Sequence, residues 1–308
     1  MPSSFQKVLV VGGGGFIGRK VVAAFVAAGA RVRVIDMMPA DRDDVEWTVG
    51  SVSDPTLVAA VAAGCDTVVF LANASLPGSS HASLSAEIQS HVLMSIAAAE
   101  TCSSVGVRTF VFASSGGTVY GYSPDPGTGL SEADPTRPIN AYGVSKLSIE
   151  HYLRLLADLR PMRTVSLRIS NPYGEGQRAA RGQGIIAAAM QHTVDGTPMT
   201  IWGDGSAERD FLHVADVAQA FVAAARYRGA EKVFNIGSGT CRSLRKTLDA
   251  VQAVTARPLE ILYEPGRTVD VQRNRLEISL ARRELGWAPA IDLAEGLART
   301  AAWWSARG

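Results

Sequence analysis

Two residues that could do proton chemistry stand four positions apart. Tyr142 and Lys146 lie in N-A-Y-G-V-S-K, a stretch that follows Pro138 and has the composition of a helix. Side chains at i and i+4 share one helical face, so the phenol and the ammonium are expected to be neighbours. An ammonium favours phenolate, and a pKa drop of ~3 units from ~10, equivalent to ~4 kcal/mol, would make Tyr142 a base near neutral pH. Alone, the pair fits an ordinary helix surface equally well.

A glycine-rich turn near the start of the chain favours a catalytic role for that pair. The stretch K-V-L-V-V-G-G-G-G-F-I-G-R-K spaces Gly12, Gly15 and Gly18 as G-x-x-G-x-x-G, between an expected strand and an expected helix. Glycines there allow a tight turn and a close approach of the backbone to a pyrophosphate, and the helix N-terminus supplies amide donors. We expect this turn to bind a dinucleotide, with Phe16 and Ile17 contacting it.

An acidic residue stands where a dinucleotide site needs one. Asp36 ends the second expected strand, 18 residues past Gly18, where its carboxylate can accept hydrogen bonds from a ribose diol. Taken alone it could be a helix cap or a surface acid. Met37 and Met38 follow, without an arginine to attract a 2′-phosphate. The cofactor is therefore predicted to be NAD rather than NADP. Its positive nicotinamide ring would act with the Lys146 ammonium to lower the pKa of Tyr142.

The elements that must position these residues alternate along the first half of the chain. Alanine-rich segments at 19–28 and 88–102 suit crossover helices between short apolar runs, and such runs are typical of parallel strands covered on both faces. We expect an α/β doubly wound parallel sheet of the Rossmann type, with a smaller interleaved α/β substrate lobe. Residues 1–170 would bind NAD, with returns near 210–236, and 171–308 would be mainly the substrate lobe. The expected strands are Lys7–Val11, Val32–Ile35, Trp47–Val49, Thr67–Leu71, Thr109–Ala113 and Thr164–Ile169.

Bulk composition excludes several classes of function. The 308 residues are 47% hydrophobic and 19% charged with a formal net charge of +1, which gives no basic surface for nucleic acid or membrane. The N-terminal stretch lacks the pattern of a secretory signal. Three widely spaced cysteines suggest buried thiols in a reducing compartment, and five scattered histidines suggest no metal site. We expect a cytoplasmic protein.

Several motifs, in order, resemble one known family. The glycine turn, S-S-G-G-T-V-Y-G (114–121) and Y-G-V-S-K (142–146) look like the extended short-chain dehydrogenases/reductases. The stretches L-R-I-S-N-P-Y-G (167–174), I-W-G-D-G-S-A-E-R-D-F-L-H-V-A-D (201–216), F-N-I-G-S-G (234–239) and R-R-E-L-G-W-A-P (282–289) resemble nucleotide-sugar epimerases of the UDP-galactose 4-epimerase type. The likeness covers nearly the whole chain.

The resemblance implies a reaction and its residues. Tyr142 would take the proton of a sugar 4-hydroxyl while hydride passes from C4 to NAD and later returns to the other face of the 4-keto sugar. Lys146 would hold the nicotinamide ribose and tune Tyr142. The family is often homodimeric. The other implied contacts are Leu71 and Ala72 for the cofactor, Asn171 for the sugar nucleotide, and Arg209 and Arg267 for its diphosphate, although Arg209 could simply pair with Asp210.

The chain also departs from the family pattern. Ser51 replaces an aspartate that contacts adenine, so recognition there would rest on Ser51 and Val52. His91 replaces an asparagine, and Asn274 falls at the position that limits sugar size. The family's catalytic Ser/Thr falls on Gly116, so a neighbouring hydroxyl must replace it. Ser115 is the first candidate and Thr118 the second, whereas Ser114 is expected to be structural.

Related enzymes on this scaffold carry out other reactions. Dehydratases carry an Asp-Glu pair where this chain has Gly117 and Thr118, which supply neither an acid nor a base, and decarboxylases carry a Glu there. A non-catalytic NAD sensor is disfavoured because Tyr142 and Lys146 are both present. A 4-ketoreductase stays open. The lead substrate is UDP-glucose/galactose or an N-acetyl form; UDP-glucuronate is the alternative if Arg178 or Arg181 faces the sugar.

Overall fold

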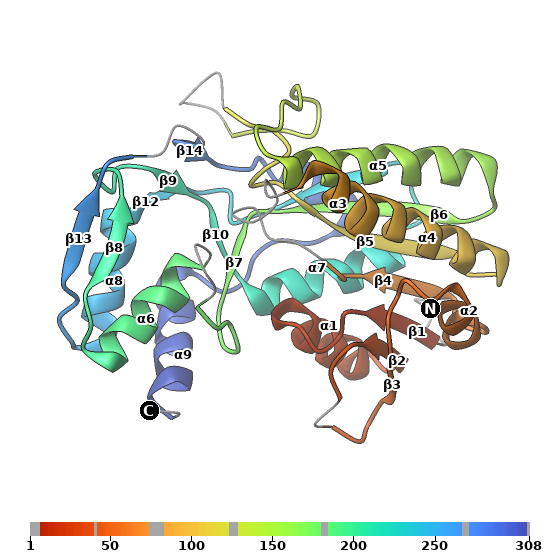
Figure 1. Ribbon diagram of the computed structural model, residues 1–308, viewed down its shortest axis with the longest axis horizontal. Coiled ribbons are helices and arrows are strands. Elements are labelled where there is room, and N and C mark those ends of the chain that lie inside the picture. Colours follow the sequence, from red (N-terminus) through yellow and green to blue (C-terminus); the bar gives the residue numbers. More distant parts are fainter. Residues whose placement is uncertain are drawn as a thin grey trace.

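A seven-stranded parallel sheet forms the centre of the protein (Figure 1). The computed structural model describes residues 7–39, 42–73, 83–122, 129–179, 184–266 and 271–306. The six strands predicted from the sequence are present, with bounds within two residues of those expected. Across the sheet the order is β11 (Val233–Ile236), β6 (Arg163–Ile169), β5 (Thr109–Ser115), β4 (Thr67–Phe70), β1 (Lys7–Val11), β2 (Arg31–Asp36) and β3 (Glu46–Val49).

Helices cover both faces of this sheet, which makes it a doubly wound α/β fold, as predicted. Along β1, Val8 and Val10 join the core on one face and Leu9 and Val11 the core on the other, because successive side chains of a strand alternate in direction. Burial on both faces explains why the strands read as continuous apolar runs. One face carries α1 (Phe16–Ala27) and α7 (Val214–Arg226), and the other α2 (Pro55–Ala62), α4 (Met94–Ser104) and α5 (Ala141–Leu159).

The crossover before β5 differs from the single helix expected over 88–102. It begins with α3 (Leu84–Glu87), capped by the Ser83 hydroxyl, continues as a π-helical segment, Ile88–Leu93, and then becomes α4. A π-helical turn holds an additional residue and is frequent at functional sites. The first crossover helix also starts earlier than expected, at Phe16 instead of Arg19.

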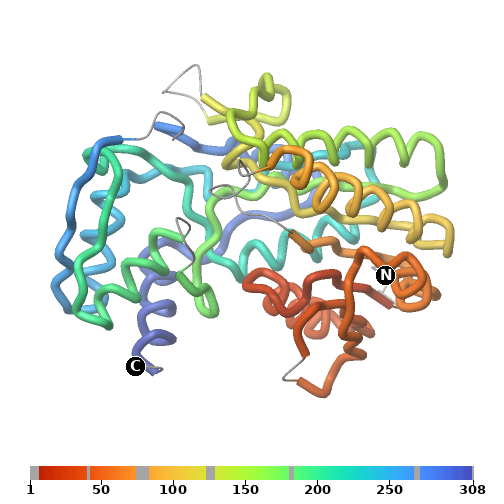
Figure 2. Tube along the Cα trace, viewed as in Figure 1, coloured from red at the N-terminus to blue at the C-terminus, as the bar shows by residue number. Residues whose placement is uncertain are grey.

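A second π-helical segment, Ala281–Leu285, packs on α7 and β11 of the central sheet. The other elements form a second group beside the carboxyl edge of the sheet (Figure 2). Here α6 (Ile185–Asp195), α8 (Leu244–Thr255) and α9 (Leu293–Ser305) share one apolar core. None of the helices within the described ranges is long and apolar enough to cross a bilayer. The short strands pair as β7 (Asn171–Tyr173) with β10 (Phe211–His213), β8 (Met199–Trp202) with β13 (Ile261–Glu264), and β9 (Glu208–Arg209) with both β12 (Arg242–Ser243) and β14 (Arg273–Asn274).

Candidate active site

The glycine-rich turn lies where β1 meets α1, and Gly12 and Gly18 have no room for side chains. Gly12 has φ 84°, and a Cβ there would lie 2.9 Å from the Ala72 amide nitrogen, just past β4. A Cβ at Gly18 would collide with the Gly12 carbonyl oxygen. Gly15 caps α1 through its backbone alone. Without side chains at Gly12 and Gly18, a phosphate group could approach the backbone amides at the α1 N-terminus.

Asp36 reaches this turn from the end of β2. Its Oδ2 accepts a hydrogen bond from the Gly14 amide over 2.8 Å, and its Oδ1 accepts one from the Met38 amide over 3.0 Å. Carboxylate oxygens have further lone pairs for a ribose diol. Ser51 and Val52 follow the neighbouring strand β3, with Ser51 exposed. The acid and the open amides together form a cradle that fits a dinucleotide.

Tyr142 and Lys146 lie in the first turns of α5. Asn140 caps this helix, and Gly143 lets it approach closely, because a Cβ there would lie 2.8 Å from the Thr118 carbonyl oxygen. The Lys146 Nζ donates to the Ala113 carbonyl oxygen over 2.8 Å and lies 5.4 Å from the centre of the Tyr142 ring. The pair expected from the i, i+4 spacing is thus assembled at the carboxyl end of β5.

Burial dominates the electrostatics of this pair. Lys146 is 2% exposed, and burial lowers its pKa to about 7, although the charges of Glu87 and Glu150 act to raise it. Burial raises the pKa of Tyr142, the charge of Glu87 raises it further, and a hydrogen bond with Asn73 acts to lower it. The sequence predicts a lowered Tyr142 pKa when both the Lys146 ammonium and a positive nicotinamide ring are present. In the protein without its cofactor, loss of solvation raises this pKa instead.

The hydroxyls of the S-S-G-G-T stretch point to different partners. Ser114 is buried and donates to the Glu150 carboxylate, the structural role expected for it. Ser115 is partly exposed at the end of β5. A Cβ at Gly117 would lie 3.9 Å from both the Ser115 Oγ and the Asn171 Oδ1, so these atoms flank one small space. The Thr118 hydroxyl instead lies 3.5 Å from the Ser115 carbonyl oxygen.

Gly116 has no space for a side chain, so a hydroxyl could not stand at this position. A Cβ there would lie 2.5 Å from the Leu276 Cδ1 and 2.9 Å from the Arg168 carbonyl oxygen. The Asn274 Nδ2 also donates to the Gly116 carbonyl oxygen over 2.9 Å. The glycine is therefore required by a close approach between β6, β14 and the turn.

The predicted substrate residues lie at different places. Asn171 starts β7, and its backbone and side-chain amides both donate to the Asp210 carbonyl oxygen over 3.0 Å. Arg209 lies in β9 opposite Arg242, and the Asp210 carboxylate accepts bonds from Ser238. Arg178 is exposed. Arg267 and Arg181 lie outside the described residues.

Two buried acids near Lys146 were missed by sequence reasoning. Glu150 binds Arg168 through an Nη2–Oε2 contact of 2.8 Å, and Glu87 lies 3.1 Å from the His91 ring. A signal for Glu150 was present, because Tyr142, Lys146 and Glu150 follow one another at four-residue spacing on one face of α5. Glu87 and His91 share that same spacing.

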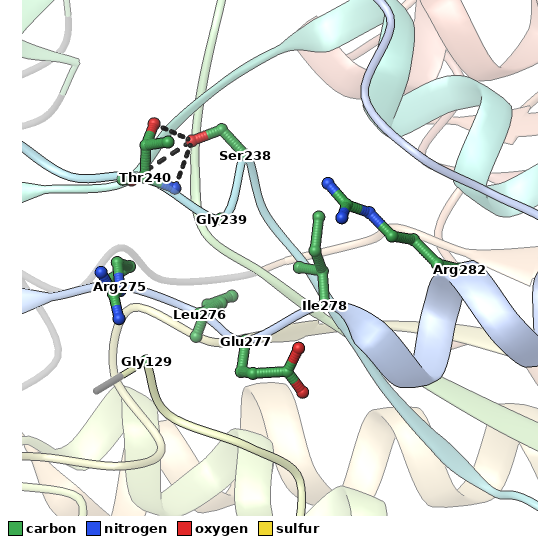
Figure 3. A pocket seen from close by; sticks show the side chains of 9 residues that line it. All are labelled: Gly129, Ser238, Gly239, Thr240, Arg275, Leu276, Glu277, Ile278 and Arg282. Carbon is green, nitrogen blue, oxygen red and sulfur yellow. Dashed lines mark hydrogen bonds between the residues drawn. The ribbon is translucent and has the colours of Figure 1, made fainter.

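A small cavity of about 220 Å³ lies next to this region (Figure 3). The turn after β11 and the segment after β14 face each other across it, and the predicted catalytic side chains do not line it. Leu276 belongs both to this cavity and to the contact that excludes a side chain at Gly116. Its lining residues are Gly129, Ser238, Gly239, Thr240, Arg275, Leu276, Glu277, Ile278 and Arg282.

A doubly wound parallel sheet with a glycine turn, an acid at the end of its second strand and a Tyr–Lys pair at its carboxyl edge defines a Rossmann-type dinucleotide enzyme. The model of the NAD dependent epimerase/dehydratase family matches residues 8–237, and the chain belongs to this family. The predicted family and the predicted cofactor, NAD, are thereby confirmed.

Known proteins resemble the chain over nearly its whole length. A dTDP-4-dehydro-6-deoxyglucose reductase from Escherichia coli is 32% identical over 94% of this chain and 95% of its own. A UDP-glucose 4-epimerase from Mycolicibacterium smegmatis is 31% identical, covering 96% and 97%. A solved structure of MoeE5 with UDP-glucuronic acid and NAD is 30% identical, with a TM-score of 0.89 and coverage of 98% and 99%.

Proposed function

We propose that the protein is an NAD-dependent nucleotide-sugar 4-epimerase that acts on a UDP-hexose. The observation that carries this proposal is the Tyr142–Lys146 pair on α5, whose ammonium binds the Ala113 carbonyl oxygen near the carboxyl end of β5. The 31% identity to a UDP-glucose 4-epimerase supports the reaction class. A reversible oxidation at a sugar carbon requires a proton acceptor and a bound dinucleotide. The proposed groups for both lie on one edge of the sheet.

The cofactor would be held by the open amides of the glycine turn and by Asp36. Phe16 and Ile17 open α1 at the same turn, and Leu71 and Ala72 lie against Gly12. When bound, NAD supplies the acceptor and donor of hydride for the sugar C4. Ser51 and Val52 would contact the adenine end.

Tyr142 would remove the proton of the sugar 4-hydroxyl and return it after the ring has turned. The Lys146 ammonium would stabilise the phenolate, because opposite charges attract strongly in a site with little water. The Ser115 hydroxyl would hydrogen-bond the reacting oxygen, and Thr118 is the second candidate for this role. Asn171, Arg209 and Arg267 would hold the sugar nucleotide, and Lys146 would also hold the nicotinamide ribose.

A panel of UDP-sugars, incubated with purified protein and no added cofactor, tests this function. Chromatography should show interconversion of C4 epimers, because an epimerase restores its cofactor in each turnover. Tyr142→Phe should abolish interconversion while NAD stays bound, which a cofactor assay on the denatured variant measures. An inactive wild type that carries NAD, or a fully active Tyr142→Phe, would refute the assignment.

The sugar is proposed to be glucose/galactose or an N-acetyl form, with UDP-glucuronate as the alternative. MoeE5 has been solved with UDP-glucuronic acid, and its 30% identity supports including hexuronates in the panel. Arg178 and Arg181, in the segment before α6, are candidates to pair with a hexuronate carboxylate. Arg178→Ala should lower turnover of UDP-glucuronate selectively if this alternative is right.

A 4-ketoreductase is the second candidate function. The observation that favours it is the 32% identity to a dTDP-4-dehydro-6-deoxyglucose reductase. Such an enzyme consumes one NADH for each ketosugar reduced, whereas an epimerase consumes none. Stoichiometric loss of NADH absorbance with a 4-ketosugar nucleotide, without epimerisation of UDP-sugars, would favour the reductase. A UDP-sugar decarboxylase would release carbon dioxide from UDP-glucuronate in the same panel.

We also propose a homodimer formed through α3, the π-helical segment and α5. These adjacent elements expose seven large apolar side chains, and a second copy with the same apolar face would bury them. Leu155→Glu should convert a dimer to a monomer in light scattering, whereas Leu262→Glu, on β13, should not. A monomeric wild type would contradict this arrangement. The exposed side chains are Leu84, Ile88, Leu93, Val144, Tyr152, Leu155 and Leu159.

We further propose which parts of the chain bind the cofactor and which bind the substrate. Residues 1–170, with returns near 210–236, would bind NAD, and 171–308 would mainly bind the substrate; β11 in the central sheet and α7 on its face support the returns. We propose the cytoplasm as the compartment, supported by the free thiols of Cys65 and Cys102, which are buried in the core.

A further inference from the structure

A second pair of titratable side chains lies buried beside Tyr142 and Lys146. Glu87 ends α3, and His91 lies in the π-helical segment that follows it. The two residues are 4% and 0% exposed, and the His91 Nδ1 lies 3.1 Å from the Glu87 Oε1. Burying a charged or polar side chain costs free energy unless other interactions compensate for it. The burial of both Glu87 and His91 therefore calls for a structural or functional explanation.

His91 orients Glu87 without adding a charge of its own. Burial and the nearby charge of Lys146 lower the His91 pKa to about 4, although Glu87 acts to raise it. The imidazole is therefore neutral at physiological pH. A carboxylate only accepts hydrogen bonds, so Nδ1 must carry the hydrogen and donate it. The buried Nε2 is then a bare acceptor, and no hydrogen-bond partner for it occurs among the described residues.

The pair belongs to the same cluster as the proposed catalytic residues. The ring centres of His91 and Tyr142 are 5.7 Å apart with an angle of 37° between the planes. The Lys146 Nζ lies 5.4 Å from that same Tyr142 ring, and α5 packs on both α3 and the π-helical segment. A π-helical turn changes which side chains face inward, and His91 lies within this one.

Two acids face Lys146, and their surroundings differ. Glu150, on α5, is held by the Arg168 guanidinium through Nε and Nη2 at 3.1 Å and 2.8 Å from its Oε2, which offsets its charge. Glu87 contacts the His91 ring, which is neutral and adds no positive charge beside the carboxylate. The charge of Glu87 raises the pKa of Lys146 and also that of Tyr142. The Asn73 side chain, which faces Tyr142 from the end of β4, acts on Tyr142 in the opposite direction.

We propose that Glu87, oriented by His91, is a positioning residue that retains the protons of Tyr142 and Lys146 and so sets the pH range in which they work. This inference rests on the proposed function, in which Tyr142 must lose its proton and Lys146 must keep its own. A carboxylate nearby opposes the first event and favours the second. Its presence therefore moves both limits of activity to higher pH.

The test is the pH dependence of kcat/KM for Glu87→Gln in the NAD-bound protein. Glutamine keeps the size and an acceptor for His91 but removes the charge. Both limbs of the profile should move to lower pH by about one unit, the order expected for loss of one nearby charge, while the maximal rate is retained. Glu87→Asp should keep the wild-type limbs. Glu100→Gln, the same change at an exposed site on α4, should also leave them unmoved.

A lower rate with unmoved limbs would show that Glu87 has only a structural role and would overturn the proposal. A direct titration of Tyr142 by NMR of 13Cζ-labelled tyrosine, assigned with Tyr142→Phe, separates this outcome from failure of the proposed function. A lowered Tyr142 pKa in Glu87→Gln supports the inference even if no UDP-sugar is converted. If Glu87→Gln does not fold, His91→Leu is the second variant, because it removes the donor that orients Glu87. His91→Leu should also lower the Tyr142 pKa, and an unchanged Tyr142 pKa in that variant overturns the inference.

Discussion

The Asn274 amide holds the Gly116 carbonyl oxygen at 2.9 Å, across 158 positions of the chain. This bond joins β14 to the turn that follows Ser115. Leu276, two residues further on, packs against Gly116 so closely that a Cβ at Gly116 would lie only 2.5 Å from the Leu276 Cδ1. The residue expected to limit sugar size is therefore also part of the support for the proposed catalytic hydroxyl.

A matched pair of glycine substitutions tests this packing. Gly116→Ala should lower the free energy of unfolding by about 1–3 kcal/mol, because its Cβ would press on the Arg168 carbonyl and Leu276. Gly117→Ala meets its nearest atoms only at 3.9 Å and should keep wild-type stability. Because that Cβ would stand between Ser115 and Asn171, Gly117→Ala should instead lower activity. Urea denaturation and turnover assays measure the two effects, and equal losses of stability would contradict the assignment.

The proposed hydroxyl can be identified by comparing Ser115→Ala with Thr118→Val. Loss of a hydrogen bond to a charged reacting oxygen costs about 1.5–3 kcal/mol, so Ser115→Ala should lower kcat by about 10- to 100-fold. Thr118→Val should change kcat far less, because the Thr118 hydroxyl faces the backbone of its own turn. The reverse order of effects would assign the role to Thr118.

Asp36 should determine how tightly NAD binds. Asp36→Asn loses the negative charge that accepts from the Gly14 amide and faces the expected ribose. Charge-assisted hydrogen bonds are about twice as strong as neutral ones, so the Kd for NAD should rise about tenfold or more, while affinity for NADP should fall less or increase. Calorimetry on cofactor-free protein measures both constants. Asp43→Asn, an exposed acid beyond β2, is the control, and an unchanged Kd in Asp36→Asn would remove Asp36 from the site.

The sheet was predictable because its strands are short apolar runs buried on both faces, and β1 was predicted to the residue. The Tyr142–Lys146 pair was predictable because helical spacing is a local property. The contact of Gly116 with Leu276 was not, since it joins segments far apart in the chain and depends on how β14 is placed. The π-helical segment was missed as well, because S-A-E-I-Q-S-H-V has an ordinary helical composition. The segment packs on α5, a tertiary contact that the local sequence does not reveal.

His91 should make the protein sensitive to acid. Its pKa is lowered from 6.5 to about 4 by folding, so protonation favours the unfolded state. Stability is therefore lost as the pH falls from 6.5 towards 4, by up to about 3 kcal/mol from this group. His91→Asn should show a shallower loss of unfolding free energy over that window. His151→Asn removes an exposed imidazole from α5 and should follow the wild-type curve. Chemical denaturation at several pH values measures the slopes, and parallel curves for wild type and His91→Asn would show that burial of His91 does not control acid stability.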